Sequence, residues 1–201
     1  MLMYMICPAK LTRLLHEKGE LSSELRGPIE KNNARPYEWM RHQMHKRIPG
    51  YRSPSIWWSW YRIDGITGKK PDLRSRLRWH WGRQGEEWTR LELDVPSVEV
   101  LLSDVDLWLF VLNNWYLAYN EEESDQWDRA HPTPKPGVGY DKDTQALVEQ
   151  SWERVFEFET TRFDPNWLPV GETVQACFET LRWRDVRTVT GFVNRPVRLL
   201  D

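Results

Sequence analysis

Blocks of apolar residues recur along the chain, and most of them are bounded by proline or glycine. Short blocks that are continuously apolar, aromatic or alternating with polar residues are typical of strands. Such blocks predict strands at residues 2–7, 56–61, 77–81, 88–95, 98–102, 173–183 and 186–193. The aromatic segment 56–61 gives the strongest signal, because aromatic side chains favour a pleated, half-buried surface.

Helices are predicted where apolar residues recur at spacings of three and four. One begins at Pro8, which suits a first helical turn, and ends at Gly19, which suits a C-cap. Ser103 is predicted to cap another helix, with Asp106 in its first turn. Two further helices are predicted from Pro36 to Pro49 and over residues 143–157.

The order of these elements favours an α+β fold over a doubly wound parallel sheet, because helices do not separate the strands one by one. No Gly-x-Gly-x-x-Gly or Walker motif is present, which argues against a fold that cradles phosphates in a glycine-rich loop. No repeat and no change of composition divides the chain, so residues 1–201 are predicted to form a single domain. Residues 120–142, rich in proline and acids, are predicted to form a long surface loop of functional interest.

The net charge of −2 provides no overall positive field that would draw the chain to nucleic acid or anionic lipid. Any contact with nucleic acid must therefore use a local basic patch. The chain contains 13 tryptophans, and this residue serves hydrophobic cores, stacking surfaces and ligand clamps alike. Composition alone thus leaves open which of these tryptophans have a functional role.

Cys7 and Cys177 are far apart and have no zinc-ligand spacing, which fits two thiols in a reducing compartment. His42 and His45 lack a third ligand nearby, so no metal site is predicted. The apolar start of the chain lacks a basic segment and is interrupted by Pro8, unlike a signal peptide or a membrane span. The sequence therefore predicts a cytoplasmic protein that does not act at a membrane.

A basic segment, KKPDLRSRLR (69–78), follows the tryptophan-rich strand directly. Basic groups beside aromatic rings are suited to ligands that carry phosphates and stacking bases, such as a dinucleotide or a nucleic-acid strand. A solvated turn that happens to contain several arginines is the alternative interpretation.

Ordered blocks across nearly the whole chain resemble an uncharacterised bacterial family of unknown function. The blocks are PYEWMRHQM (36–44), IWWSW (56–60), KPDLR (70–74), LELDVP (91–96), VLLSDVDLWLFVLNNWYL (100–117), SWERVF (151–156) and VQACFETLRWRDV (174–186). The resemblance is specific, but it implies no activity.

A second resemblance, to the ADP-ribosyltransferase fold, covers the two ends of the chain. The strand Tyr4–Cys7 followed by the helix KLTRLLHEKGEL is similar to the entry of that fold, and VQACFETLRWRDVRTVTGF is similar to its catalytic-glutamate strand and closing strand. This resemblance implies a split sheet, mixed or antiparallel, with flanking helices and with NAD bound as substrate between the sheet halves. It implies Gln175 and Arg74 as catalytic residues. The NAD-binding residues that it implies are Tyr4, Cys7, Trp58, Trp60, Lys70 and Asp72.

The chain departs from that family's pattern at several positions. Cys7 stands where a polar or basic residue is expected, and Ser59 occupies the place of a Ser-Thr-Ser motif. Gln175 stands at the glutamate position; its amide can hydrogen-bond a ribose hydroxyl but carries no charge and accepts no proton near neutral pH. Glu172 and Glu179 are the nearby acids that could substitute for it.

The function that this resemblance implies is transfer of ADP-ribose to a macromolecule, with nucleic acid favoured over protein as acceptor. A toxin or phage-defence effector, neutralised by an antitoxin or another partner protein, is the corresponding biological expectation. Two alternatives stay open: a non-catalytic module that binds RNA or DNA through its Trp and Arg residues, and a protein-interaction subunit anchored by exposed tryptophans.

Overall fold

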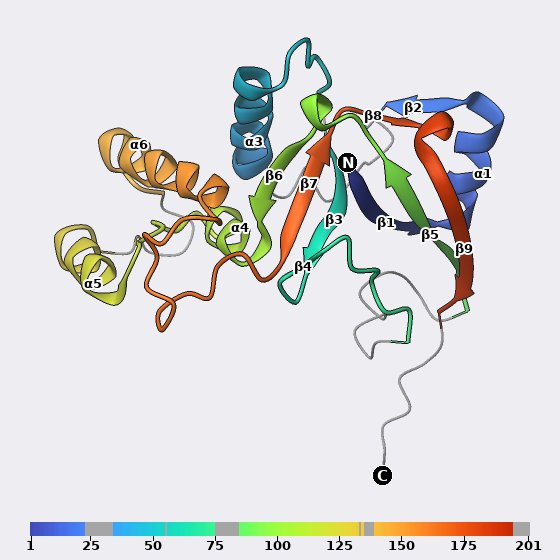
Figure 1. Ribbon diagram of the computed structural model, residues 1–201. Coiled ribbons are helices and arrows are strands. Elements are labelled where there is room, and N and C mark those ends of the chain that lie inside the picture. The colour runs from blue at the N-terminus through green and yellow to red at the C-terminus, as the bar shows by residue number, and fades with distance from the viewer. Residues whose placement is uncertain (23–33, 55, 75–84, 133, 135–138, 195–201) are drawn as a thin grey trace.

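The computed structural model of the chain describes residues 1–22, 34–54, 56–74, 85–132, 134 and 139–194. Its main element is a sheet with the strand order β6-β7-β3-β1-β5-β9, and β4 pairs with β3 beside this path (Figure 1). The strands are β1 (Leu2–Pro8), β3 (Trp57–Ile63), β4 (Ile66–Thr67), β5 (Glu87–Asp94), β6 (Leu101–Asp104), β7 (Val174–Phe178) and β9 (Val186–Val193). A separate small sheet pairs β2 (Glu20–Ser22) with β8 (Thr180–Arg182).

Helices flank this sheet. The α-helices are α1 (Ala9–Lys18), α3 (Ala34–Arg47), α4 (Val105–Leu112), α5 (Glu121–Ala130) and α6 (Lys142–Ser151). Short 3₁₀ helices are η3 (Ser97–Glu99), η4 (Trp152–Phe156) and η5 (Trp183–Asp185). In Figure 1, α1 lies near β5 and β9, whereas α3, α4 and α6 lie near β6 and β7. The predicted α+β class is confirmed, and the strand pairings of the described residues are all antiparallel.

Two hydrophobic cores cover opposite faces of the sheet, as the alternation of side chains along a strand requires. The core on the α1 face includes Met3, Met5, Leu15, Leu91 and Ala176. The core on the face towards α3, α4 and α6 includes Met40, Leu107, Val148, Trp152 and Cys177. Neighbouring residues of β7 therefore belong to different cores, which fixes the register of this strand, because a slip by one residue would exchange the two faces.

The sheet is split between β1 and β3. These strands share a single register pair, Tyr4 with Trp60. In contrast, β1 pairs with β5 along its whole length from Leu2 to Pro8, and β3 pairs with β7 from Trp57 to Arg62. Within this one seven-stranded sheet, β1 and β3 are therefore the least extensively paired neighbours, and they divide it into two well-paired halves, β6-β7-β3 and β1-β5-β9.

Local elements agree with the sequence prediction in most places, but the strand predicted at 98–102 is β6, which begins at Leu101 after the 3₁₀ helix η3. The first helix ends as expected, because Gly19 has a φ of 78° and its N–H binds the carbonyl oxygen of Leu15. The predicted helix 143–157 is α6 followed by the 3₁₀ turn η4. The predicted loop 120–142 is wrong in its first half, which forms α5 with Asn120 as N-cap. The strand predicted at 77–81 lies outside the described residues.

The predicted capping role of Ser103 is also wrong, because the N-cap of α4 is the next residue, Asp104. One carboxylate oxygen of this buried side chain accepts hydrogen bonds from the backbone N–H groups of Asp106 and Leu107, at 2.8 and 3.0 Å. The other oxygen accepts the N–H of Gly171 at 2.6 Å. Burial raises the pKa of Asp104, and these hydrogen bonds oppose the shift. Asp104 therefore ties the start of α4 to the segment that leads into β7.

Gly171 is required at this junction. Its φ of 82° lies in the left-handed region, and a Cβ at this position would stand 2.7 Å from the carbonyl oxygen of Phe158. Any side chain here would move the backbone N–H that Asp104 binds.

We expect Asp104→Ala to lower the free energy of unfolding by about 3 kcal/mol, because it removes a helix cap and leaves buried N–H groups without a partner. Asp141→Ala is the matched control, because Asp141 caps α6 through two backbone N–H groups but is exposed. It should cost only about 1 kcal/mol. Urea unfolding followed by circular dichroism measures both values, and equal losses would contradict the joining role assigned to Asp104.

Candidate functional site

One row of side chains crosses the sheet at the point where its two halves meet. The strand register places Ser103, Gln175, Trp60, Tyr4 and Glu92 directly opposite one another along β6, β7, β3, β1 and β5. Residues that are directly opposite in paired strands point to the same face of a sheet. These five residues are called the central row below, and their face is the one on which α3, α4 and α6 pack.

The β7 side of the central row is polar and largely buried. Gln175 has 8% of its surface exposed, and its side-chain Nε2 donates to Oγ of the fully buried Ser103 at 3.1 Å. This hydrogen bond holds the amide of Gln175 next to Trp60, which is half-buried. The pair offers a flat aromatic surface beside a fixed amide, and such groups suit an aromatic ring and a sugar hydroxyl.

The β1 side of the central row carries charge next to a buried phenol. Tyr4 is 1% exposed, and the ammonium of Lys70 lies 5.9 Å from its ring centre. Lys70 also pairs with the carboxylate of Glu92 at 2.9 Å. Burial, followed by the charge of Glu92, raises the pKa of Tyr4. The phenol therefore keeps its proton at neutral pH and remains a hydrogen-bond donor.

The segment that contains Lys70 is anchored over the same face of the sheet. Arg90 lies on the same face of β5 as Glu92. Its guanidinium donates to the carbonyl oxygen of Pro71 at 2.9 Å. A turn holds the segment at its start, where the N–H of Gly68 binds the carbonyl oxygen of Tyr61 at 2.8 Å. Lys70 is thus positioned by two strands of opposite sheet halves.

Trp58 lies on the same face as Trp60, opposite Cys177 of β7. Its ring packs against those of Trp108 and Tyr37, with centroid distances of 5.1 and 5.8 Å. The indole N–H is buried and has no hydrogen-bond partner among the described residues. A buried donor without a partner costs free energy, so this N–H destabilises the packing of Trp58.

The structure leaves three predicted site residues outside this arrangement. Cys7 lies on the opposite face of β1 from Tyr4, buried next to the hydroxyl groups of Thr12 and Thr89 at 3.5 and 3.4 Å. The physical reason is the pleat, since residues three apart on a strand face opposite sides. Arg74 is 91% exposed and pairs with Asp72 of its own turn at 3.2 Å.

Of the predicted site residues, Tyr4, Trp60 and Gln175 lie in the central row, Lys70 lies beside it, and Trp58 is on the same face. The sequence prediction did not include Ser103, which was interpreted as a helix cap, or the charged residues Glu92 and Arg90. The alternation of residues 88–95 contained a usable signal, because it places Arg90 and Glu92 together on the face opposite the buried leucines.

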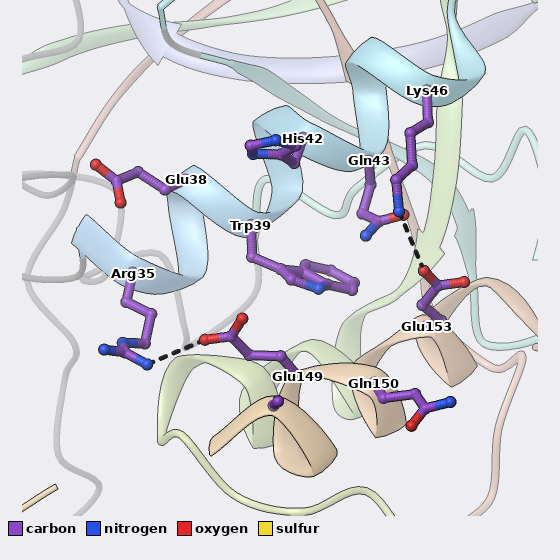
Figure 2. A pocket seen from close by; sticks show the side chains of 10 residues that line it. Arg35, Glu38, Trp39, His42, Gln43, Lys46, Glu149, Gln150 and Glu153 are labelled. Carbon is purple, nitrogen blue, oxygen red and sulfur yellow. Dashed lines mark hydrogen bonds and ion pairs between the residues drawn. The ribbon is translucent and has the colours of Figure 1, made fainter. Parts of the chain in front are cut away.

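A pocket of about 590 Å³ lies elsewhere, between α3 and α6, and contains none of the predicted site residues. Figure 2 shows Trp39 at its centre and two ion pairs that bridge its walls. Arg35 pairs with Glu149 at 3.0 Å, and Lys46 pairs with Glu153 at 3.6 Å. These ion pairs join α3 to α6 and to η4 across the opening.

Among the described residues, no group of His, Cys, Asp and Glu side chains is arranged to hold a metal ion. In the same part of the chain, no helix has both the length and the apolar character needed to cross a bilayer.

Comparison with known proteins identifies one family, described as a domain of unknown function (DUF3841), which matches residues 9–186. No curated protein and no solved structure matches the chain. The matched range includes Trp60, Lys70 and Gln175, together with nearly every element of the fold. The chain belongs to this family of domains of unknown function.

Proposed function

We propose that the chain binds NAD at the central row and transfers ADP-ribose to a macromolecule, with nucleic acid favoured as acceptor. One observation carries the proposal. The strands that the resemblance to ADP-ribosyltransferases singles out, those of Tyr4, Trp60 and Gln175, are neighbours, and these three side chains share one face. They meet where β1 and β3 separate after a single register pair, which is where that resemblance places the substrate.

The transfer breaks the bond between the nicotinamide nitrogen and C1′ of the ribose. Neutral nicotinamide leaves, a nucleophilic atom of the acceptor bonds to C1′, and the acceptor loses a proton. Trp60 would stack on the nicotinamide, the amide of Gln175 would bind a ribose hydroxyl, and the protonated phenol of Tyr4 would donate a hydrogen bond. These groups orient the sugar for attack, which is the contribution that positioning alone can make.

Lys70, which is ion-paired with Glu92 of the central row, would pair with the pyrophosphate. Its present partner is Glu92, so the ligand must compete with that carboxylate. The side chain of Lys70 is 56% exposed, whereas that of Glu92 is 18% exposed. A pyrophosphate that took Lys70 would leave this largely buried carboxylate without its partner, so binding must also offset that loss.

Gln175 supplies no negative charge to the developing positive charge on the ribose. The two acids that could substitute for it lie outside the central row. Glu179 accepts the backbone N–H of Arg52 at 2.9 Å, and Glu172 lies beside Gly65, beyond the end of β7. We therefore expect the chain to bind NAD but to transfer its ADP-ribose slowly.

Trp60→Ala and Gln175→Ala should each reduce NAD turnover at least about tenfold, since each removes one stacking or hydrogen-bonding contact to the reacting part of NAD. Trp115→Ala is the matched control, because Trp115 is 52% exposed and packs on Phe110 of α4, not on a residue of the central row. Radiolabelled NAD incubated with total RNA, DNA and protein measures the transfer and identifies the acceptor. Equal activity of all three folded variants would contradict the proposal. Growth arrest on expression, relieved by Trp60→Ala, would support a toxin.

Gln175→Glu should raise the rate of nicotinamide release, because it adds a carboxylate beside the reacting ribose. Burial raises the pKa of a carboxyl group, so the gain should be absent at low pH and appear as pH rises through that pKa. Gln175→Met, of similar size and without charge, serves as the control. Unchanged rates at every pH, with NAD binding retained, would show that residue 175 does not face the reacting sugar.

Non-catalytic binding of single-stranded nucleic acid by the same face is the second candidate, and the amide at position 175 favours it. Trp60 would then stack on a base and Lys70 would contact a phosphate. Salt-dependent binding of an oligonucleotide that quenches tryptophan fluorescence, without NAD turnover by wild type or Gln175→Glu, would establish this function instead.

A further inference from the structure

One edge of the main sheet is open in the part of the chain that the structure describes. β9 is the last strand of the order β6-β7-β3-β1-β5-β9, and its pairings among these residues are all with β5 (Figure 1). A strand at an edge presents backbone N–H and C=O groups with which another strand can pair. The exposed residues of β9 are Arg187, Thr188, Val189, Gly191 and Val193.

The opposite edge of the same sheet is covered by the chain itself. β6 is four residues long, and its residues Leu101, Ser103 and Asp104 are buried. The 3₁₀ helix η4 packs on β6, and Asp104 leads directly into α4 as its N-cap. The two edges therefore differ, and β9 is the one that another strand can reach.

The features that normally protect an edge strand are confined to the start of β9. Such strands usually carry lysine, proline or a bulge that discourages pairing with another chain. In β9 the one charged residue is Arg187, which pairs with Asp94, and the register shift against β5 lies beside it, between Glu92 and Leu93. The remaining residues, 188–193, read TVTGFV and contain neither charge nor proline. This part of the edge is therefore suited to pairing with another strand.

Two exposed valines lie symmetrically about the glycine of this segment. Val189 and Val193 are 42% and 47% exposed, and each is two residues from Gly191. Val189 is opposite Leu91, which belongs to the core on the α1 face. Because side chains alternate along a strand, both valines and the bare Cα of Gly191 lie on this α1 face.

Gly191 is not required by the fold of a single chain. A Cβ at this position would meet no atom of the described residues within 4 Å, and the residue is not among the glycines with a positive φ. Glycine weakens the interior of a strand, and it often marks a place where another backbone approaches closely. A glycine between two exposed valines therefore points to a partner at this edge.

We propose that β9 pairs with β9 of a second copy of this chain, antiparallel and about a two-fold axis at Gly191. This register sets Val189 of each copy against Val193 of the other, so the exposed valines cover one another on the α1 face. A second copy fits because a two-fold contact must be self-complementary, and an uncharged segment with valines equally spaced about a glycine meets that condition. No like charges oppose one another within residues 188–193.

The dimer joins the two main sheets into one and leaves the proposed NAD site free. The central row lies on the sheet face opposite to the valines, so dimerisation and NAD binding can be tested separately. The contact is confined to one strand of each copy and should bury less than the roughly 1,200 Å² of most stable interfaces. Association should therefore be weak and should depend on protein concentration.

Sedimentation velocity of the full chain, from well below to well above micromolar concentration, measures this association. Wild type should change from monomer to dimer over the range. Gly191→Lys should weaken dimerisation at least about tenfold, because two like charges would stand directly opposite each other at the axis. Ile66→Lys is the matched control, because it adds the same charge at a residue of β4 that is 57% exposed, and it should dimerise as wild type does.

A charge exchange tests the register itself. Val189→Glu should weaken dimerisation at least about tenfold, because it sets a carboxylate against a valine that the contact buries. Val189→Glu with Val193→Lys should restore it, since the two new charges then face each other across the contact. Within one chain these positions are about 13 Å apart along the strand, so they restore association only by pairing between copies.

Circular dichroism checks that every variant is folded. A wild type that stays monomeric at all concentrations would overturn the proposal and leave the β9 edge to a different protein. Equal dimerisation of Gly191→Lys and wild type would overturn it as well, and so would a double variant that associates no better than Val189→Glu alone. Loss of NAD binding with dimerisation intact would count against the NAD proposal alone.

Discussion

The pairing of Tyr4 with Trp60 is the constraint on which the rest of the molecule depends, because it is the single register contact between the two halves of the sheet. The core on the α1 face spans both halves, because it joins Met3 and Leu91 to Trp57 and Ala176. The position of one half relative to the other is therefore set by this shared core, by the Tyr4–Trp60 contact and by segments that cross it, such as the one containing Lys70. A ligand that contacts both Tyr4 and Trp60 would therefore also affect the relative position of the two halves.

The strands and the first helix could be predicted from the sequence because their signals are local. Alternation over residues 88–95 and the aromatic run 56–61 are properties of a few consecutive residues. The helix cap was predicted incorrectly because Ser103 and Asp104 are both good capping residues and stand next to each other. What selects Asp104 is its hydrogen bond with the backbone N–H of Gly171. The two residues are 67 positions apart in the sequence, so a local pattern does not reveal this contact.

The candidate site depends even more on contacts between distant residues. Strand order decides that Tyr4, Trp60 and Gln175 are neighbours, and periodicity does not reveal which strands pair; the family resemblance supplied that expectation. The pleat alone, in contrast, was sufficient to separate Cys7 from Tyr4. α5 escaped prediction because it has no apolar stripe, and the stack of Trp127 on Tyr116 replaces such a stripe.

The attachment of α5 has a consequence for the energetics of the chain, because this helix is held by the stack of Trp127 on Tyr116 and by the polar contacts of Glu123 with Tyr116, Tyr119 and Arg154. Opening this helix exposes no buried side chain of its own, so its local unfolding should cost far less than unfolding of the sheet. Its backbone amides would then exchange with solvent through local openings, while those of β1 and β5 exchange only when the whole domain unfolds. Substitutions in α5 should therefore lower the free energy of unfolding of the domain only slightly, so this helix can change in sequence while the sheet does not.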